Sequence, residues 1–237
     1  MPLAIAAMAV VLGLPGPARA APVERSVVLP AELAGAGDVL PVNRRKTFLV
    51  PRRSTDGVLV FAPYSVNDYR GGWTRSRSHS SRSGDTVSQS AEGTRSFSFA
   101  LGGGAAALQA DCDERAEAAA THERDEPAPV LVPDHSLRCT LYAAGGPFEL
   151  SVASGRGELV GTGGDRFTVS AIFGVASRWE ATDATGLLLR TEAGDPVAAV
   201  DLAGKGRVVL ARGLQPPGRD VLAAAAAALL LADLTRW

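Results

Sequence analysis

The sequence predicts a mainly β fold, an antiparallel barrel or sandwich of short hairpins packed around a hydrophobic C-terminal helix. From Phe148 onward, short apolar runs alternate with turns rich in Gly, Pro and Asp every 8–12 residues, a spacing typical of all-β sandwiches and barrels. Earlier in the chain, Ser96–Leu101 and Ala106–Cys112 alternate apolar and polar residues on either side of Gly102–Gly104, which predicts a hairpin. The chain closes with the uninterrupted apolar run Val221–Ala232, which predicts a buried helix.

Residues 1–20 have the pattern of a secretory signal peptide. Leu3–Leu14 forms the apolar stretch, and Pro15 ends it. Ala18-Arg19-Ala20 then places small residues at the −3 and −1 positions of a cleavage site before Ala21. No Lys or Arg precedes the apolar stretch, which departs from the usual pattern, and the alternative is a buried N-terminal helix. We expect an exported protein of the periplasm or cell envelope, and the excess of arginine over lysine together with the high alanine content indicates a GC-rich bacterial genome.

The mature chain is expected to hold one domain. Residues 21–43, which Pro and Gly interrupt, are expected to form an irregular N-terminal arm or one added strand. Residues 44–237 are expected to form a single β-rich domain that ends in the apolar helix 220–234. Besides the hairpin, the expected strands are Thr47–Val50, Val58–Ala62, Val130–Val132, Ser136–Ala143, Phe148–Ala153, Glu158–Val160, Phe167–Val175, Arg178–Ala181, Leu187–Thr191, Val197–Leu202 and Arg207–Ala211.

The two cysteines, Cys112 and Cys139, fit an exported chain. Alternation within 108–112 and within 137–141 turns both side chains toward the core. Two inward cysteines on neighbouring strands predict a disulfide, and two separate buried thiols are the alternative.

A Ser- and Arg-rich segment, Arg75–Ser90, has almost no apolar residue and is expected to be a mobile loop or a hairpin tip. From Arg44 to Arg95 the chain carries ten basic and four acidic residues. This excess predicts either a surface for an anionic lipid, a polysaccharide or a nucleic acid, or simply a solvated loop, and an exported protein seldom meets nucleic acid. The candidate ligand surface consists of Arg70, Trp73, Arg75 and Arg77.

The acidic segment Asp113–Glu126 is expected to be a short exposed helix or a long loop. Its side chains and those that follow would suit a divalent cation, although their spacing matches no known site and a solvated charged loop is the favoured interpretation. The residues concerned are His122, Glu123, Asp125, Glu126, Asp134 and His135. No nucleotide-binding, metalloprotease or nucleophile-elbow motif occurs, so we predict no catalytic residue, no metal ligand and no cofactor.

The terminal helix allows two interpretations. The residues Val221–Leu234 would span roughly 21 Å at ~1.5 Å per residue, whereas a bilayer core is about 30 Å thick. A core helix is therefore favoured over a membrane-associated tail. The segment Val197–Leu234, two strands followed by this helix, resembles the tubby C-terminal-like group, which includes LURP-one-related proteins and phospholipid scramblases. The resemblance implies a closed antiparallel barrel around a hydrophobic helix and contact with lipid, and it brings no catalytic residue.

These patterns favour an exported bacterial envelope protein that is a non-enzymatic structural or binding module. Its expected partner is a lipid or another component of the envelope, and the sequence makes no prediction of oligomeric state. One alternative is an envelope hydrolase with an unrecognised site, which loss of an activity on changing His122 or His135 without unfolding would support. The other is a structural protein tethered to the membrane by its C-terminal helix.

Overall fold

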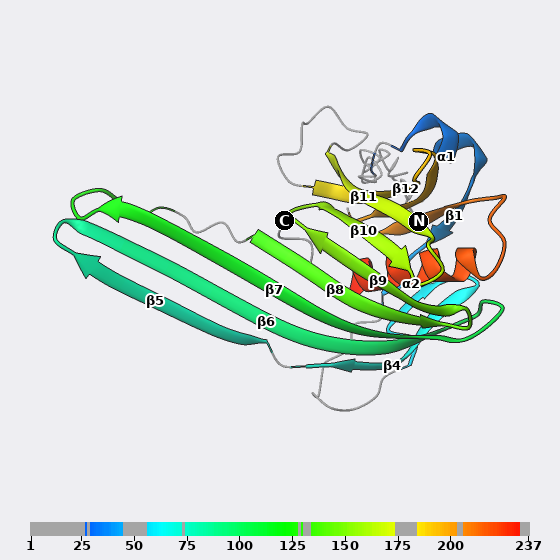
Figure 1. Cartoon of the computed structure of the whole chain (residues 1–237), viewed down its shortest axis with the longest axis horizontal. Helices are drawn as coiled ribbons and strands as arrows, with labels where there is room; N and C mark the ends of the chain where they lie inside the picture. The colour runs from blue at the N-terminus through cyan, green and yellow to red at the C-terminus, as the bar shows by residue number, and fades with distance from the viewer. Residues whose placement is uncertain are drawn as a thin grey trace, which may run out of the picture.

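A computed structural model describes residues 27, 29–44, 56–72, 74–127, 129, 134–173, 184–202 and 206–232 (Figure 1). Signal residues 1–20 and three of the expected strands, Thr47–Val50, Val130–Val132 and Arg178–Ala181, lie outside these ranges. The elements are α1 (Ala31–Ala36), β1 (Gly37–Pro41), β2 (Asn43–Arg44), β3 (Leu59–Phe61), β4 (Tyr64–Gly71), β5 (Arg75–Ser83), β6 (Thr86–Gly102), β7 (Leu108–Glu123), β8 (Asp134–Ala143), β9 (Gly146–Ala153), β10 (Arg156–Gly161), β11 (Arg166–Phe173), β12 (Ala184–Thr191), β13 (Pro196–Asp201), β14 (Arg207–Ala211) and α2 (Gly218–Leu231).

The strands form one antiparallel sheet that is nearly closed into a barrel. Its order is β1-β14-β13-β12-β11-β10-β9-β8-β7-β6-β4-β3-β2, and β5 pairs with β6 beside this path. The two ends of the order are neighbours in the chain, because only Val42 separates β1 from β2. The N–H of Val42 donates to the carbonyl of Gly206 at 3.3 Å. One short segment therefore joins the two ends of the sheet, and the predicted mainly β fold is confirmed.

Helix α2 occupies the interior of this barrel (Figure 1). Every residue from Val221 to Leu229 is 0% exposed. The helix contacts β7 and β8 as well as β13 and β14, which lie far apart in the order of the sheet. An apolar surface on all sides of a helix needs an apolar environment on all sides, and the closed sheet supplies it. The terminal run is thus a core helix.

In the part of the chain that the structure describes, no helix has both the length and the apolar character needed to cross a membrane.

Polar groups hold the N-terminal end of α2. The buried carboxylate of Asp220 accepts a hydrogen bond from the Tyr64 hydroxyl at 2.9 Å and another from the N–H of Ala105 at 2.9 Å. Ala105 lies in the β6–β7 turn, and a Cβ at the neighbouring Gly104 would collide with this carboxylate. Glycine is therefore needed where the turn meets the helix.

The C-terminal end of α2 is held by Arg95 on β6. Its guanidinium donates to the carbonyl of Leu231 at 2.9 Å and pairs with Glu114 on β7 at 2.6 Å. A cation at the carbonyl end of a helix is favourable to the helix dipole. The free carbonyl at this end is thereby satisfied from the barrel wall.

Residues 31–43 differ from the irregular arm expected for 21–43. Helix α1 packs on the outside of the barrel, where Leu33 contacts a small cluster with Leu188, Ala199 and Val209. β1 then pairs with β14 along its whole length. The second possibility given for this segment, one added strand, corresponds to β1. Helix α1, which precedes β1, was not expected from the Pro- and Gly-rich sequence.

Three strands project from the barrel as an arm (Figure 1). The arm is β5 with residues 86–94 of β6 and residues 115–123 of β7. The Ser- and Arg-rich segment is almost entirely strand, β5 and the start of β6, so the expectation of a loop is wrong and the expected hairpin tip is confined to residues 84–85. The acidic segment from Asp113 is mostly strand, and the expectation of a helix or a long loop is wrong as far as Glu123. Both segments gain backbone hydrogen bonds by pairing with β6, so they need no hydrophobic core of their own.

The disulfide joins the barrel wall at the base of the arm. Cys112 and Cys139 stand directly opposite each other on β7 and β8, with a Cα–Cα distance of 4.1 Å, and both are buried. The structure contains the predicted cross-link.

Candidate interaction surface

The interior of the barrel is filled by its own helix, so the outer surface is where this protein can meet a ligand. The alanines of α2 let the wall approach closely, and the leucines at its end complete the packing. The arm is the largest departure from the barrel's outline (Figure 1). It is therefore the first candidate for contact with a partner.

The two faces of the arm differ in chemistry. Paired residues of its three strands share a face, and the inner face continues the lining of the barrel. Its successive rows are Ser76/Gly93/Ala116, Ser78/Ala91/Ala118, Ser80/Gln89/Ala120 and Arg82/Val87/His122. The outer face carries the rows Arg75/Thr94/Arg115, Arg77/Glu92/Glu117, His79/Ser90/Ala119, Ser81/Ser88/Thr121 and Ser83/Thr86/Glu123. The inner face is thus small and mostly uncharged, and the outer face is polar.

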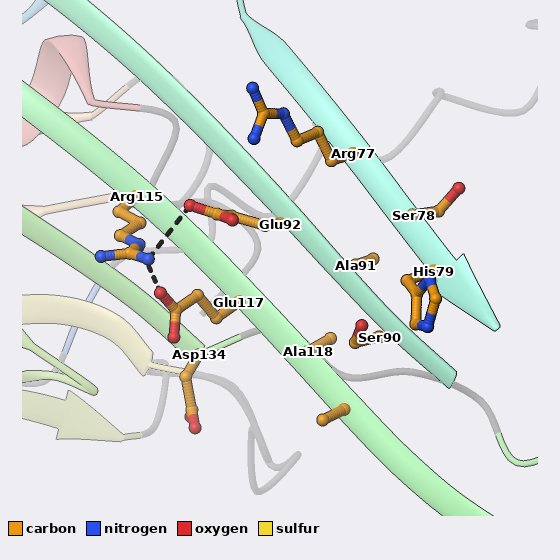
Figure 2. A pocket seen from close by; sticks show the side chains of 11 residues that line it. Arg77, Ser78, His79, Ser90, Ala91, Glu92, Arg115, Glu117, Ala118 and Asp134 are labelled. Atoms are coloured by element: carbon orange, nitrogen blue, oxygen red, sulfur yellow. Dashed lines mark ion pairs between the residues drawn. The ribbon is translucent and has the colours of Figure 1, made fainter. Parts of the chain in front are cut away.

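The carboxylates at the base of the outer face are paired within the sheet. Arg115 forms ion pairs with Glu92, at 3.0 Å, and with Glu117 (Figure 2). These residues line a surface hollow of about 780 Å³ that also includes Arg77 and His79. The hollow is a mixed-charge surface and not a basic one, because Glu92 on β6 and Glu117 on β7 lie in the same row as Arg77 of β5.

Strand β5 is the exposed edge of the arm. All nine of its side chains are exposed, and its arginines are Arg75, Arg77 and Arg82. Among the residues that the structure describes, none of these three arginines forms an ion pair or a hydrogen bond through its side chain. Three cations are thus available on one edge strand.

The candidate ligand residues fall on this same outer face. Arg70 is exposed on β4 opposite Ser98, and Arg75 lies opposite Thr94 on the same strand β6. The two positions on β6 are four residues apart, about 14 Å at ~3.4 Å per residue. Trp73 lies outside the described residues. The structure therefore places Arg75 and Arg77 together on the edge and Arg70 further along the wall.

The candidate metal ligands are spread over the arm. His122 stands opposite Val87 near its tip, whereas His135 is buried opposite Ala116 at its base. Six residues of β7 separate these positions, roughly 20 Å, so the two histidines do not share a site. In the described ranges, no group of three or more His, Cys, Asp or Glu side chains is placed to hold a metal ion.

Among the described residues, Tyr64 is a buried ionisable group with a structural role that the sequence analysis did not find. Burial, followed by the hydrogen bond to Asp220, raises the pKa of Tyr64 to about 12. Burial also raises the pKa of Tyr69. Only the fold brings Tyr64 to Asp220, 156 positions away, so no local pattern could have indicated the pair.

The fold and its surface define an antiparallel barrel that encloses its own C-terminal helix and extends a three-stranded arm with an arginine-bearing edge. Comparison of the chain with protein-family models, with curated proteins and with solved structures finds no match in any of the three.

Proposed function

We propose that this chain is an exported, non-enzymatic binding module of the bacterial envelope, and that the arm is its contact element. The observation that carries the proposal is β5, nine residues of strand whose side chains are all exposed. A strand whose side chains are all exposed, and which lies away from the core, adds little to the stability of the fold. Contact with another molecule is the simplest role for such a strand.

Two features support export. The pattern at residues 1–20 is that of a signal peptide, and the Cys112–Cys139 disulfide is the kind of bond that persists in an oxidising compartment. The test is to express the full chain in a bacterial host, fractionate the cells and sequence the N-terminus of the product. We expect a periplasmic protein that begins at Ala21, and a cytoplasmic product that keeps residues 1–20 would overturn this half of the proposal.

The contact role can be tested in the same cells by site-specific photocrosslinking. A photoreactive residue replaces Ser80 on β5, and a matched control replaces Asp195, which is exposed in the β12–β13 turn of the barrel. We expect a discrete adduct with an envelope component from position 80 and none from position 195. Equal labelling from both positions, or an adduct from the barrel alone, would refute the arm as the contact element.

Lipid is the competing ligand, since the tubby-like resemblance implies lipid contact. The arm gives it little electrostatic support: together with the turn residues at its tip, it comprises residues 75–94 and 115–126, which hold five arginines against six carboxylates. Anionic membranes attract a surface through its net positive charge, and this arm has none. We therefore place a protein ahead of a bilayer as the partner.

A further inference from the structure

We propose that β5 is a docking edge for one added strand, and that its occupant is an extended acidic segment of a partner protein. The inference rests on the proposed function and specifies what the arm binds.

The geometry of an edge strand supplies the first part of the argument. Among the described residues β5 pairs with β6 and with no other strand. Alternate N–H and C=O groups of an edge strand point away from its sheet and form a template for a further strand. The nine residues of β5 give this template a length of about 31 Å at ~3.4 Å per residue. Backbone pairing would therefore supply affinity over a segment of eight or nine residues.

The charges of β5 define the chemistry of the segment. Arg75, Arg77 and Arg82 carry no ion pair among the described residues, and β5 contains no carboxylate. Glu92 lies opposite Arg77 but is paired with Arg115 (Figure 2). Arginine at an edge also discourages pairing with neutral or basic strands, because the added strand would bury part of the charge without a partner. The carboxylates of an acidic strand would instead form ion pairs with these arginines.

The spacing of the arginines fixes a pattern in the partner. Arg75 and Arg77 point to the outer face, whereas Arg82 points to the inner face. In an antiparallel addition, a residue opposite Arg82 is followed five positions later by the residue opposite Arg77 and seven positions later by the residue opposite Arg75. Acidic residues at peptide positions 1, 6 and 8 therefore meet all three arginines on the correct faces. The reversed pattern, 1, 3 and 8, is the one that suits a parallel strand.

Fluorescence anisotropy with a labelled peptide tests the proposal on the purified, exported full-length protein. The probe is Glu-Thr-Val-Thr-Val-Glu-Thr-Glu-Thr, and its control replaces the three Glu by Gln. We expect the acidic peptide to bind about tenfold more tightly than the control, since three exposed ion pairs each contribute modestly. The triple variant Arg75→Gln/Arg77→Gln/Arg82→Gln should remove this preference. Arg138→Gln, on the outer face of β8 and exposed, is the matched control that should retain it.

Two N-methylated forms of the acidic peptide separate strand addition from simple charge attraction. One carries N-methyl groups at alternate odd positions and the other at alternate even positions, with unchanged charge. Only one set of N–H groups faces β5 in an added strand, so one form should lose binding and the other keep it. Equal binding of both forms overturns strand addition, as does an acidic peptide that binds no better than its Gln control.

The outcomes also separate this inference from the proposed function. If β5 crosslinks to an envelope protein in cells while the acidic peptide fails to bind, the arm remains the contact element and the acidic strand is wrong. Arginine-dependent binding to phosphatidylglycerol vesicles without peptide binding overturns the proposal in favour of a lipid surface.

Discussion

Truncating one leucine inside the barrel, Leu222→Ala, should destabilise the protein by about 4 kcal/mol. Leu222 is 0% exposed on α2. The substitution removes three buried carbon groups at ~0.8 kcal/mol each, about 2.4 kcal/mol, and leaves a cavity whose cost is added to this term. The sheet surrounds the helix, so its wall has little freedom to collapse, which places the cost in the upper half of the ~2–5 kcal/mol range for such changes. For a chain of this size, each kcal/mol lowers Tm by roughly 2–4 °C, so Tm should fall by about 8–16 °C.

Circular dichroism melts of the oxidised protein measure this effect, with Val39→Ala as the control. Val39 is 48% exposed on β1, and its truncation should shift the free energy of unfolding by less than about 1 kcal/mol. A chain that stops at Arg219 lacks the helix and should lose its cooperative transition. If Leu222→Ala instead melts within about 2 °C of the unchanged protein and the truncated chain no longer floats with liposomes, the helix is a membrane anchor and its place in the barrel is refuted.

Three further predictions concern the disulfide, the helix clamp and a tyrosine. Reducing Cys112–Cys139, which closes a loop of sequence separation 27, should lower stability by about 3 kcal/mol in paired urea titrations, and coincident curves would contradict a cross-link. Arg95→Met leaves the carboxylate of Glu114 buried without its ion-pair partner and should cost about 3–5 kcal/mol; the double change Arg95→Met/Glu114→Leu should recover much of it, and additive losses would refute the pairing. The folded pKa of Tyr64, about 12, exceeds the ordinary tyrosine value of 10.0, so its contribution to stability is fully present below pH 10 and is lost as pH rises through 12. Tyr64→Phe should therefore flatten the decline in stability above pH 10, and an unchanged slope would contradict the shift.

The barrel was predictable where one face of a strand is buried. The hairpin Ser96–Leu101 with Ala106–Cys112 shows this, because its alternation also orients Cys112 toward the core. The expected strands between Ser136 and Ala211 that fall on described residues are found within a few residues of their bounds. The terminal helix was predictable because every residue from Val221 to Ala232 is apolar.

The arm was not predictable because its strands bury almost nothing. Hydrophobic periodicity reports a buried face, and β5 consists only of Arg, Ser and His where a core strand would alternate apolar with polar residues. The arm could have been found by extending the predicted hairpin of Ser96–Leu101 with Ala106–Cys112. Its strands β6 and β7 keep one register from Leu101↔Leu108 out to Thr86↔Glu123. Ala116, Ala118 and Ala120 continue the inward positions of this register beyond Cys112, although Ala119 on the outer face breaks the alternation of small with polar residues.

The position of the disulfide links the stability of the barrel to the exposure of the arm. β6 and β7 run without interruption from the core into the arm, so the arm inherits its register from side chains packed against α2. Cys112–Cys139 fixes β7 to β8 at the junction, and the Arg95–Glu114 pair lies two residues further out. Beyond this point the strands are held by backbone pairing, the exposed ion pairs of Arg115 and mostly half-buried or exposed side chains, a condition in which local opening costs little. The arm is thus firmly placed at its base and weakly stabilised at its edge. An added strand on β5 would supply the missing backbone partners at the edge, which is where the arm has most stability to gain.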